Sequence, residues 1–594
     1  MADGAGGCCL GKELLSGNEA IARGAWEAGV SLARAYPGTP STEILETLVG
    51  YEGVDAAWSP NEKVALEVAA GASYAGARCL VAMKHVGLNV AADPLFTLSY
   101  TGVRGGLVIV TADDPGAHSS QNEQDNRWYA VAAKLPLFEP SDSEEARAYT
   151  RYAFELSEEY DTPVLLRTTT RVSHGKSLVE PVEPSPRRPV TAFEPDRAKF
   201  VMIPAWARAR HVIVEERQRA LAEAASRSPL NRVEWSDRSL GIVASGVAYH
   251  YAREVYPHAS FLKLGFPYPF PAELVARFAA GVKKVFVVEE LDRFLETHAR
   301  AAGIELCAKP DEFLVGEFSP DIVAAIVGGG EAASVEAAPK PPALCPGCPH
   351  RGVFYVLSKL GLIVTGDIGC YTLGTLPPLS ALDTCLCMGA GVNHMHGLRK
   401  VLPREQAARV VAVIGDSTFV HSGITGVLDI VYDNADGLVI ILDNGTTAMT
   451  GRQDHPATGR TLSGGQAPRL SLEELCRACG VPWVRTVDPY NIAELRKAVE
   501  EGRRTGGPAV LVARAPCLLL ERRRGAAPVV DPDACVGCGA CHDLGCPAIK
   551  EGDREGGRRG KSGPPVISST LCTGCGLCVE VCRVGAIKRS AGGG

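Results

Sequence analysis

Short apolar runs alternate with segments of helical periodicity along most of the chain. Three runs rich in aliphatic residues stand out near the start: Cys79–Met83, Leu107–Thr111 and Pro163–Thr168. In the stretches between them, apolar residues recur at the spacing of a helix. Strands that alternate with helices in this way are typical of a parallel sheet covered by helices. We therefore predict a doubly wound α/β domain over residues 14–190.

A second, smaller α/β unit is predicted over residues 200–327. Two segments there, Leu240–Ser245 and Lys284–Glu289, have the composition of strands. The residues that follow, 328–342, include few large apolar side chains and several glycines and prolines. Such a composition indicates a linker between domains.

A third domain, predicted over residues 343–516, has a β-α-β unit at its centre. Its two apolar runs are Val410–Ile414 and Leu438–Leu442. Between them, the apolar residues are spaced like one face of a helix: Ile424, Val427, Leu428 and Val431.

Both apolar runs of this unit end in polar residues. The first is followed by Gly415-Asp416-Ser417 and the second by Asp443-Asn444-Gly445. In an open α/β sheet, ligands bind at the carboxyl ends of the strands. The Asp416 carboxylate and the Asn444 amide oxygen would suit Mg²⁺, which takes oxygen ligands and often binds together with phosphates. An ordinary β-α-β unit with polar turns would look the same, so these residues alone leave both interpretations open.

Length and composition limit the class of protein. At 594 residues the chain is long enough for about four domains. A hydrophobic fraction of 46% with 22% charged residues is that of a soluble globular protein, and a net charge of −7 argues against nucleic acid as a partner. No signal peptide and no long apolar stretch is evident. We expect a cytoplasmic protein without membrane contact.

Of the 20 cysteines, eight lie in the last sixty residues, at the spacings of metal ligands. Two CxxCxxC triplets are each accompanied by a fourth cysteine, and in two-cluster ferredoxins that fourth residue binds the other cluster. We predict a two-cluster ferredoxin domain over residues 529–590, with two [4Fe–4S] clusters. One would be held by Cys535, Cys538, Cys541 and Cys582, and the other by Cys572, Cys575, Cys578 and Cys546.

Zinc binding is the alternative for this segment, but zinc sites rarely use eight cysteines in doubled triplets. The segment departs from the bacterial ferredoxin pattern in two ways. Four residues separate Cys541 from Cys546 where three are usual, and Cys582 is followed by Arg583 instead of proline.

Several segments resemble the 2-oxoacid:ferredoxin oxidoreductases. The Asp416-to-Asn444 spacing is similar to the thiamine diphosphate motif. YPGTPSTE (36–43) looks like the family's substrate loop, NEKVALEVAAGASYAGAR (61–78) its cofactor-activating segment and LDNGTTAMTG (442–451) its cofactor segment. The domain order is most like that of the alpha subunits of the indolepyruvate-specific members. Three further segments are also similar to those subunits: CPGCPHRG (345–352), DDPGAHSSQNEQDNR (113–127) and TAMTGRQDHP (447–456).

The resemblance covers essentially the whole chain except its first dozen residues, including Cys8 and Cys9, which match nothing. It implies a pyrimidine-binding thiamine diphosphate domain (14–190), a transketolase C-terminal-like domain (200–327), a diphosphate- and Mg²⁺-binding domain (343–516) and the ferredoxin tail. The class of fold is therefore multidomain α/β.

Roles for individual residues follow from the resemblance. Glu62 would contact N1′ of the cofactor's aminopyrimidine and share a proton with it. Asp416, Asn444 and the backbone carbonyl of Thr446 would hold the Mg²⁺ that binds the diphosphate, beside Gly415 and Ser417. Thr39 would contact the substrate carboxylate or carbonyl, and Arg104 or His85 could add positive charge there.

A third [4Fe–4S] cluster beside the thiamine is a further expectation. Related oxidoreductases hold one by a CxxC pair and two distant cysteines. The corresponding residues here are Cys345, Cys348, Cys370 and Cys517. Free cysteines packed in a core are the alternative.

These features together predict oxidative decarboxylation of aryl 2-oxoacids, with acyl transfer to coenzyme A and electrons passed to ferredoxin. There are three alternatives. The enzyme could carry out the same chemistry on pyruvate or a branched-chain acid, or it could be a non-oxidative thiamine decarboxylase. The third alternative is an electron carrier in which the α/β domains serve as a scaffold. The family has an additional module for which no segment remains. We therefore expect a smaller beta subunit and an α2β2 heterotetramer.

Overall fold

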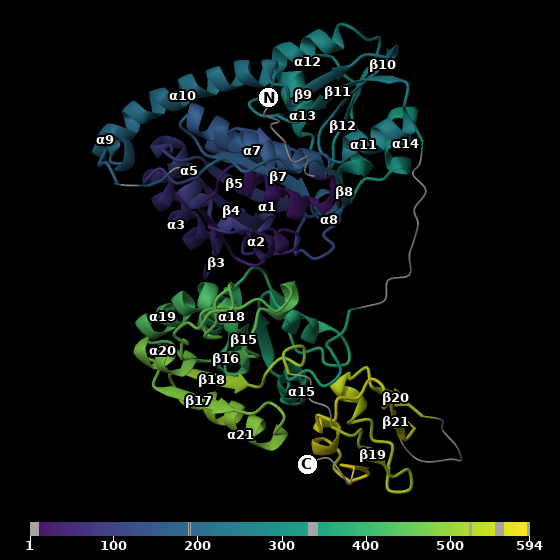
Figure 1. Ribbon diagram of the computed structural model, residues 1–594. Helices are drawn as coiled ribbons and strands as arrows, with labels where there is room; N and C mark the ends of the chain where they lie inside the picture. Colours follow the sequence, from purple (N-terminus) through teal and green to yellow (C-terminus); the bar gives the residue numbers. More distant parts are fainter. Residues whose placement is uncertain are drawn as a thin grey trace, which may run out of the picture. The chain divides into compact units, whose positions relative to one another are not determined.

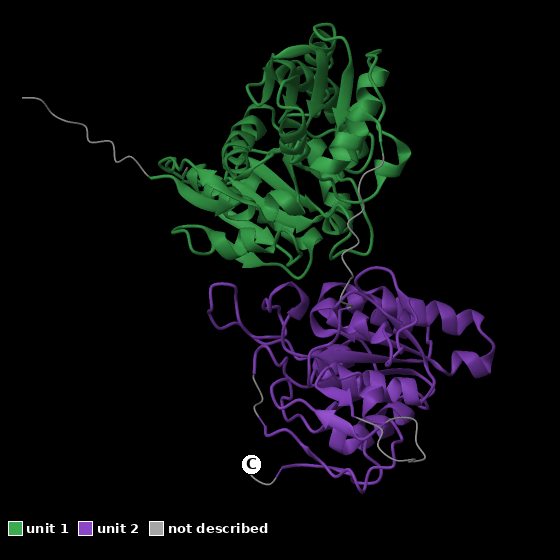
Figure 2. Ribbon diagram, turned by 90° about the vertical axis from the view of Figure 1, so that its right-hand side faces the viewer, with its two compact units in different colours: residues 1–336 green, residues 337–594 purple. Residues whose placement is uncertain are grey.

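The computed structural model describes residues 11–187, 189–190, 192–330, 342–521, 525–552 and 563–590. The chain divides into two compact units, residues 1–336 and 337–594, shown in separate colours in Figure 2. Most of the predicted linker at 328–342 lies outside the described residues, as do Cys8 and Cys9.

A six-stranded parallel sheet forms the centre of the first part of unit 1 (Figure 1). Its order is β3 (Asp55–Trp58), β2 (Leu32–Ala35), β4 (Cys79–Lys84), β5 (Leu107–Asp113), β7 (Val164–Thr169) and β6 (Leu137–Phe138). One group of helices that pack together is α1 (Gly17–Glu27), α2 (Thr42–Leu48) and α7 (Ser143–Glu159). Another is α3 (Glu62–Tyr74), α4 (His85–Val90) and α5 (Ala92–Thr101). The predicted doubly wound fold is confirmed, and β4, β5 and β7 begin within one residue of the predicted strands.

The register of this sheet brings three strand ends together. Lys84 at the end of β4 pairs with Ala112 of β5, and Asp113 at the end of β5 pairs with Thr169 of β7. The polar residues that follow β2, β4, β5 and β7 therefore share one edge of the sheet. In a parallel sheet this is the edge at which ligands bind.

A four-stranded sheet forms the second part of unit 1. Its order is β12 (Val285–Val288), β10 (Asp237–Ala244), β11 (Ala259–Leu264) and β9 (Asn231–Glu234), with β9 antiparallel. The long helix α10 (Pro204–Arg227) precedes it, and its other helices are α11 (Ala248–Val255), α12 (Ala272–Ala279), α13 (Phe294–Ala301) and α14 (Pro320–Gly328). A two-stranded antiparallel pair, β1 (Glu13–Ser16) with β8 (Lys176–Val179), joins residues far apart in the sequence and was not predicted.

A second six-stranded parallel sheet is the core of unit 2. Its order is β14 (Thr384–Cys385), β13 (Ile363–Gly366), β15 (Val410–Gly415), β16 (Gly437–Asp443), β18 (Pro508–Arg514) and β17 (Trp483–Val487). Helices α15 (His350–Lys359) and α21 (Ile492–Gly502) pack against each other, as do α16 (Ala390–Val401) and α19 (Ile424–Tyr432). The predicted β-α-β unit is present as β15, α19 and β16.

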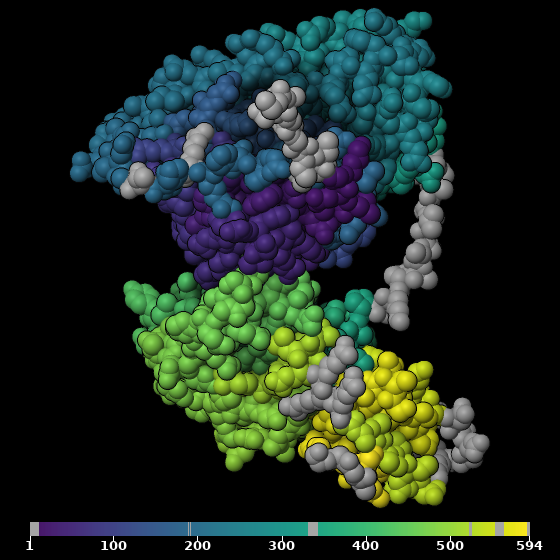
Figure 3. All heavy atoms as spheres, in the orientation of Figure 1, coloured from purple at the N-terminus to yellow at the C-terminus, as the bar shows by residue number. Residues whose placement is uncertain are grey.

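The cysteine-rich tail forms a small lobe of unit 2, coloured yellow in Figure 3. It includes the antiparallel pairs β19 (Val529–Val530) with β22 (Ile587–Lys588) and β20 (Ile549–Glu551) with β21 (Pro565–Ile567), and the short helix α22 (Leu577–Glu580). Leu544, Leu577 and Val581 of the lobe belong to the same buried cluster as Val353 and Phe354 of α15. The lobe is thus packed into the core of unit 2. Among the described residues, no helix is both long and apolar enough to cross a membrane.

Candidate functional site

Glu62 begins helix α3 and is only 5% exposed. The side chain of Asn61 caps this helix by accepting a hydrogen bond from the amide of Val64 at 2.9 Å. The Glu62 carboxyl group lies against Gly87 of α4 so closely that a β-carbon at residue 87 would come within 2.6 Å of Oε1. The missing side chain of Gly87 therefore makes room for this buried carboxyl group.

The polar turn after β2 is closed and well anchored. The amide and the hydroxyl of Ser41 both donate to the carbonyl oxygen of Gly38, at 2.8 and 2.9 Å. The side chain of Asn18 donates to the carbonyl oxygen of Pro40 at 2.6 Å. Thr39, the predicted substrate residue, is thereby held at the carboxyl edge of the sheet.

Lys84 lies against this turn. A β-carbon at residue 38 would come within 2.9 Å of Cβ of Lys84, so Gly38 allows the turn to approach β4. The Lys84 ammonium donates to the carbonyl oxygen of Ser119 at 2.9 Å. Burial lowers its pKa to about 8.

His85 and Arg104 are the two residues predicted to add positive charge beside the substrate. His85 is at this edge, where its Nε2 lies 3.1 Å from Oδ1 of Asn122. Burial, together with the adjacent Lys84, lowers the pKa of His85, so the ring is neutral near pH 7. Arg104 precedes β5 at the opposite edge, where it donates to the carbonyl oxygen of Glu194 and stacks over Phe200. The structure does not bring Arg104 to the other predicted residues.

The polar loop after β5 is organised by Asp114. This buried carboxylate accepts hydrogen bonds from the amide of Ser119, from the hydroxyl of Ser120 and from the hydroxyl of Thr170. Burial alone would raise the pKa of Asp114, but these donors lower it below its usual value. The loop therefore has a fixed ionised centre.

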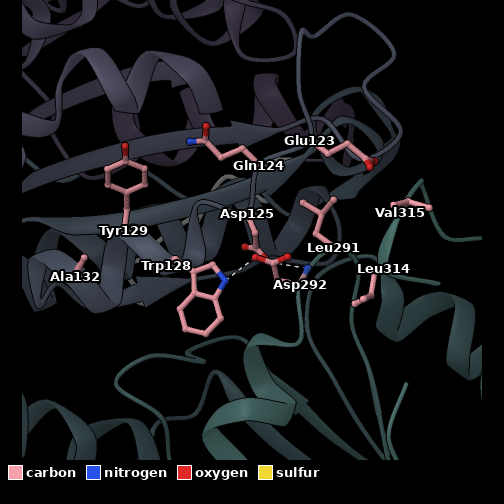
Figure 4. Close-up of a pocket in the computed structure, with 10 residues that line it drawn as sticks. All are labelled: Glu123, Gln124, Asp125, Trp128, Tyr129, Ala132, Leu291, Asp292, Leu314 and Val315. Atoms are coloured by element: carbon pink, nitrogen blue, oxygen red, sulfur yellow. Dashed lines mark hydrogen bonds between the residues drawn. The ribbon is translucent and has the colours of Figure 1, made fainter. Parts of the chain in front are cut away.

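The far end of the same loop lines a cavity of about 610 Å³ between the two parts of unit 1 (Figure 4). Arg127, fully buried, bridges Asp125 in the loop and Glu289 directly after β12, at 2.5 and 2.8 Å. The indole nitrogen of Trp128 donates to Asp292 at 2.7 Å. These contacts lock the loop to the second part of unit 1.

In unit 2, Asp416 occupies the first position of the short helix α18 (Asp416–Thr418), directly after β15. Its carboxylate accepts from the amides of Ser417 and Gly445, both at 2.8 Å, and Nε2 of His455 lies 3.3 Å away. Burial alone would raise the pKa of Asp416, but the His455 ring and the two amides lower it below its usual value. This carboxylate remains ionised and would suit a divalent cation.

Asn444 and Thr446 lie beside Asp416 because Gly445 donates to that carboxylate. The side-chain oxygen of Asn444 accepts from the amide of Thr446 at 3.2 Å, and its Nδ2 lies 3.4 Å from Nε2 of His350. Burial lowers the pKa of His350 to about 4, so this ring is neutral. The three predicted Mg²⁺ residues are all buried, and they lie where the segments that follow β15 and β16 meet.

Asp367, directly after β13, is a further buried carboxyl group at the carboxyl edge of the unit 2 sheet. It accepts from the hydroxyl of Tyr371 and from the amide of Gly389, the latter at 2.9 Å. Burial raises its pKa to about 7. Gly415 packs closely against the ring of Tyr371. A β-carbon at residue 415 would come within 2.8 Å of that ring.

The four cysteines considered for a third cluster are neighbours. Burial raises the pKa of Cys370 to about 11, and repulsion from Cys517 and Cys345 adds to the shift. Burial likewise raises the pKa of Cys348 to about 12, with contributions from Cys345 and Cys370. Thiols that raise one another's pKa in this way would ionise readily only when bound to a metal centre.

The tail cysteines form two groups, each around a small cavity. The first cavity is lined by Cys535, Cys538, Cys541 and Cys582, and the second by Cys546, Cys572, Cys575 and Cys578. In the described part of the chain, no three Cys, His, Asp or Glu side chains converge as the ligands of a single ion would. Four thiolates spread around a cavity fit a [4Fe–4S] cluster, in which each thiolate binds a different iron.

The additional residue between Cys541 and Cys546 is absorbed by a 3₁₀ turn, His542–Leu544. Gly545 ends the turn at φ +62°, a left-handed conformation that glycine adopts without strain. Its amide donates to the carbonyl oxygen of His542 at 2.8 Å. Leu544 is buried in the core of unit 2. The insertion therefore leaves Cys546 beside the second triplet.

Arg351 links the two kinds of cysteine group. Its guanidinium donates to the carbonyl oxygen of Cys345 at 3.0 Å, and to those of Leu544 and Gly545 at 2.9 and 2.6 Å. Burial lowers its pKa, and the nearby Cys546 and Cys348 oppose that shift. This buried cation thus lies between the CxxC pair and the tail.

Sequence reasoning did not single out Lys84, Asp367, His350, His455 or Arg351. His350, Arg351 and His455 lie within segments noted only for resemblance, CPGCPHRG and TGRQDHP. Lys84 ends an apolar strand, and nothing local distinguishes it from a lysine at the protein surface.

Comparisons with known families agree with this geometry. The model of the pyruvate flavodoxin/ferredoxin oxidoreductase thiamine diphosphate-binding domain matches residues 23–225. The C-terminal TPP-binding domain of thiamine pyrophosphate enzymes matches 367–513, and a 4Fe-4S dicluster domain matches 527–583. These matches identify thiamine diphosphate and iron–sulfur clusters as the cofactors.

Proteins named indolepyruvate oxidoreductase subunit IorA match nearly the whole chain. The protein from Methanothermobacter marburgensis is 44% identical and that from Archaeoglobus fulgidus 42% identical, each over 91% of this chain and 92% of its own. A solved 2-oxoglutarate:ferredoxin oxidoreductase from Magnetococcus marinus matches more distantly, with 17% identity and a TM-score of 0.44 over 53% of this chain and 65% of that chain. The chain therefore belongs to the family of indolepyruvate oxidoreductase IorA subunits.

Proposed function

We propose that this protein catalyses the oxidative decarboxylation of aryl 2-oxoacids, indolepyruvate among them. The 2-oxoacid and coenzyme A would give an arylacetyl-CoA, CO₂, a proton and two electrons. Ferredoxin would accept the electrons one at a time. The names of the relatives support the aryl substrate.

One observation carries the proposal. The loop after β16, in which Asn444 lies and whose Gly445 donates to Asp416, is joined by a backbone hydrogen bond to Cys517, one of a group of four neighbouring cysteines. A site for thiamine diphosphate and a site for an iron–sulfur cluster would then be adjacent. That adjacency favours one-electron oxidation over simple release of an aldehyde.

The roles of the chain's own residues follow from the geometry. When bound, thiamine diphosphate supplies the electron sink that allows a 2-oxoacid to lose CO₂. Glu62, buried at the start of α3, would hold a proton at N1′ of the aminopyrimidine. Thr39 would position the substrate at the carboxyl edge of the first sheet.

Asp416, Asn444 and Thr446 would hold Mg²⁺. Asp416 is an ionised carboxylate, and the amide and carbonyl oxygens of the other two complete a set of hard donors. Gly415 and Ser417 flank the carboxylate, and the closeness of Gly415 to Tyr371 leaves no room for a side chain at residue 415.

The electrons would leave through the cysteine groups. A cluster on Cys345, Cys348, Cys370 and Cys517 would receive them first. The two tail clusters would follow, with Arg351 between the CxxC pair and the Cys546 loop.

Anaerobic turnover with a panel of 2-oxoacids tests the proposal. Indolepyruvate, phenylpyruvate, pyruvate and a branched-chain acid would each be supplied with coenzyme A and ferredoxin. We expect the arylpyruvates to give the highest kcat/KM. A preference for pyruvate or a branched-chain acid would assign another substrate, and aldehyde release without ferredoxin reduction would indicate a non-oxidative decarboxylase.

The working enzyme is proposed to be an α2β2 heterotetramer with a smaller beta subunit. The word "subunit" in the names of the relatives supports a partner. Native mass measurement of the purified enzyme decides the point. A fully active species of 62.7 kDa, the mass of one chain, would contradict it.

A further inference from the structure

Lys84 is a buried cation whose charge is not balanced by an ion pair. The residue is only 9% exposed at the carboxyl end of β4. Within the described residues, its ammonium group forms one hydrogen bond, to the carbonyl oxygen of Ser119, and no ion pair within 4 Å. An ammonium group has three donors, so two are uncommitted.

The nearest acidic group does not neutralise Lys84 by contact. Asp114 attracts the ammonium from a distance, but its oxygens accept from Ser119, Ser120 and Thr170. Burying a charge without a partner is costly, and proteins normally avoid it. A buried cation with free donors is therefore suited to an anionic ligand.

The position of Lys84 identifies where that anion would lie. On one side, the stem of Lys84 packs against Gly38, next to Thr39. On the other, the same strand end continues into α4, whose Gly87 contacts the carboxyl group of Glu62. Lys84 thus lies between the substrate turn and the residue proposed to act on the cofactor.

Neither of the other basic residues considered for this edge can supply the charge. His85 is neutral near pH 7, and Arg104 is at the opposite edge of the sheet. Lys84 is therefore the basic group best placed to meet a carboxylate beside Thr39.

We propose that Lys84 binds the carboxylate of the 2-oxoacid, donating its two uncommitted N–H groups to the carboxylate oxygens. This inference rests on the proposed function and adds to it a specific substrate contact. Any 2-oxoacid has this carboxylate, so the assignment does not depend on which side chain the substrate carries.

The test compares a substrate that has the carboxylate with one that lacks it. Lys84→Met removes the charge while keeping most of the side-chain length. The variant would be assayed as the assembled enzyme with its partner subunit, using the 2-oxoacid that the wild type converts best. The corresponding aldehyde, which the same cofactor can oxidise to the acyl-CoA, serves as the substrate without a carboxylate.

We expect kcat/KM for the 2-oxoacid to fall by about 10- to 100-fold, the range for losing a charged hydrogen bond. Most of the loss should appear in KM. The rate with the aldehyde should stay within a few-fold of wild type. Exchange of the proton at C2 of bound thiamine diphosphate should also be unchanged, because Glu62 is intact.

Two further variants separate binding from structure. Lys134→Met removes a partly exposed lysine paired with Glu215 and should behave like the wild type. Lys84→Arg keeps the charge and should recover part of the loss. Equal losses with the 2-oxoacid and the aldehyde, or no loss with either, would overturn the proposal. Failure of the proposed function would appear separately, as a wild-type enzyme with normal C2 exchange that reduces no ferredoxin.

Discussion

The backbone amide of Cys517 donates a hydrogen bond of 2.9 Å to the carbonyl oxygen of Asn444. Two residues earlier, the amide of Ala515 donates to the carbonyl oxygen of Asp443 at 3.0 Å. The chain leaving β18 is thereby held against the loop that follows β16. A candidate cluster ligand and a candidate Mg²⁺ ligand are thus fixed to each other by backbone contacts.

Asp416→Ala should abolish the binding of thiamine diphosphate. The diphosphate would lose the Mg²⁺ that neutralises it, and the amides of Ser417 and Gly445 would lose their acceptor. Calorimetric titration with thiamine diphosphate and Mg²⁺ measures the effect. Asp429→Ala, which removes an exposed carboxylate beside His396, is the control. Wild-type affinity in Asp416→Ala would remove Asp416 from the metal site.

Glu62→Gln should leave the cofactor bound but slow turnover by roughly 10²-fold or more, the usual size of an acid–base contribution. An amide of the same shape fits the space beside Gly87 but cannot exchange a proton with N1′. The rate of C2-proton exchange, followed by NMR, reports this step. Glu67→Gln changes a half-exposed glutamate on the same helix and should have no effect. Exchange at the wild-type rate in Glu62→Gln would exclude the role.

Cys517→Ser should remove one cluster and leave two. We expect about 12 iron atoms per wild-type chain, three clusters of four, and about 8 in the variant. Cys479→Ser replaces a cysteine of unit 2 that lies in none of the three groups and should retain all the iron. Iron analysis together with EPR of the reduced protein makes the measurement. Equal iron in Cys517→Ser and the wild type would leave Cys517 as a core thiol.

Removal of the tail clusters is better tested by substitution than by deletion. Deleting the chain from Asp531 onward would remove all the tail cysteines, but Leu577, Val581 and Ile587 belong to the core of unit 2. Truncation would therefore expose apolar surface of the diphosphate-binding domain. Cys535→Ser should instead keep that core and cofactor binding while lowering the rate of ferredoxin reduction. Reduction at the full rate would mean that electrons leave by another route.

Much of the fold could be predicted because its strands are buried on both faces. The runs at Cys79, Leu107 and Val410 are nearly continuous aliphatic sequences, and each became a strand of a parallel sheet. The β1–β8 pair could not be predicted, since it joins Glu13 to Val179 and neither short segment has a distinctive pattern.

The site was less predictable because the role of a side chain depends on the edge of the sheet at which it lies. Arg104 precedes a strand and so lies at the amino edge, whereas Lys84 ends a strand and lies at the carboxyl edge. Burial adds a second effect that sequence does not show. It keeps His85 neutral, while its neighbour Lys84, with a pKa of about 8, stays largely charged near pH 7.

The central claim is that electrons from decarboxylation leave through the iron–sulfur clusters. Anaerobic stopped-flow mixing of the assembled enzyme with indolepyruvate and coenzyme A, without ferredoxin, tests it most directly. We expect cluster absorbance to bleach during the first turnover, with two electrons stored for each CO₂ released and arylacetyl-CoA as the product. Release of CO₂ and arylacetaldehyde while the clusters remain oxidised would contradict the account.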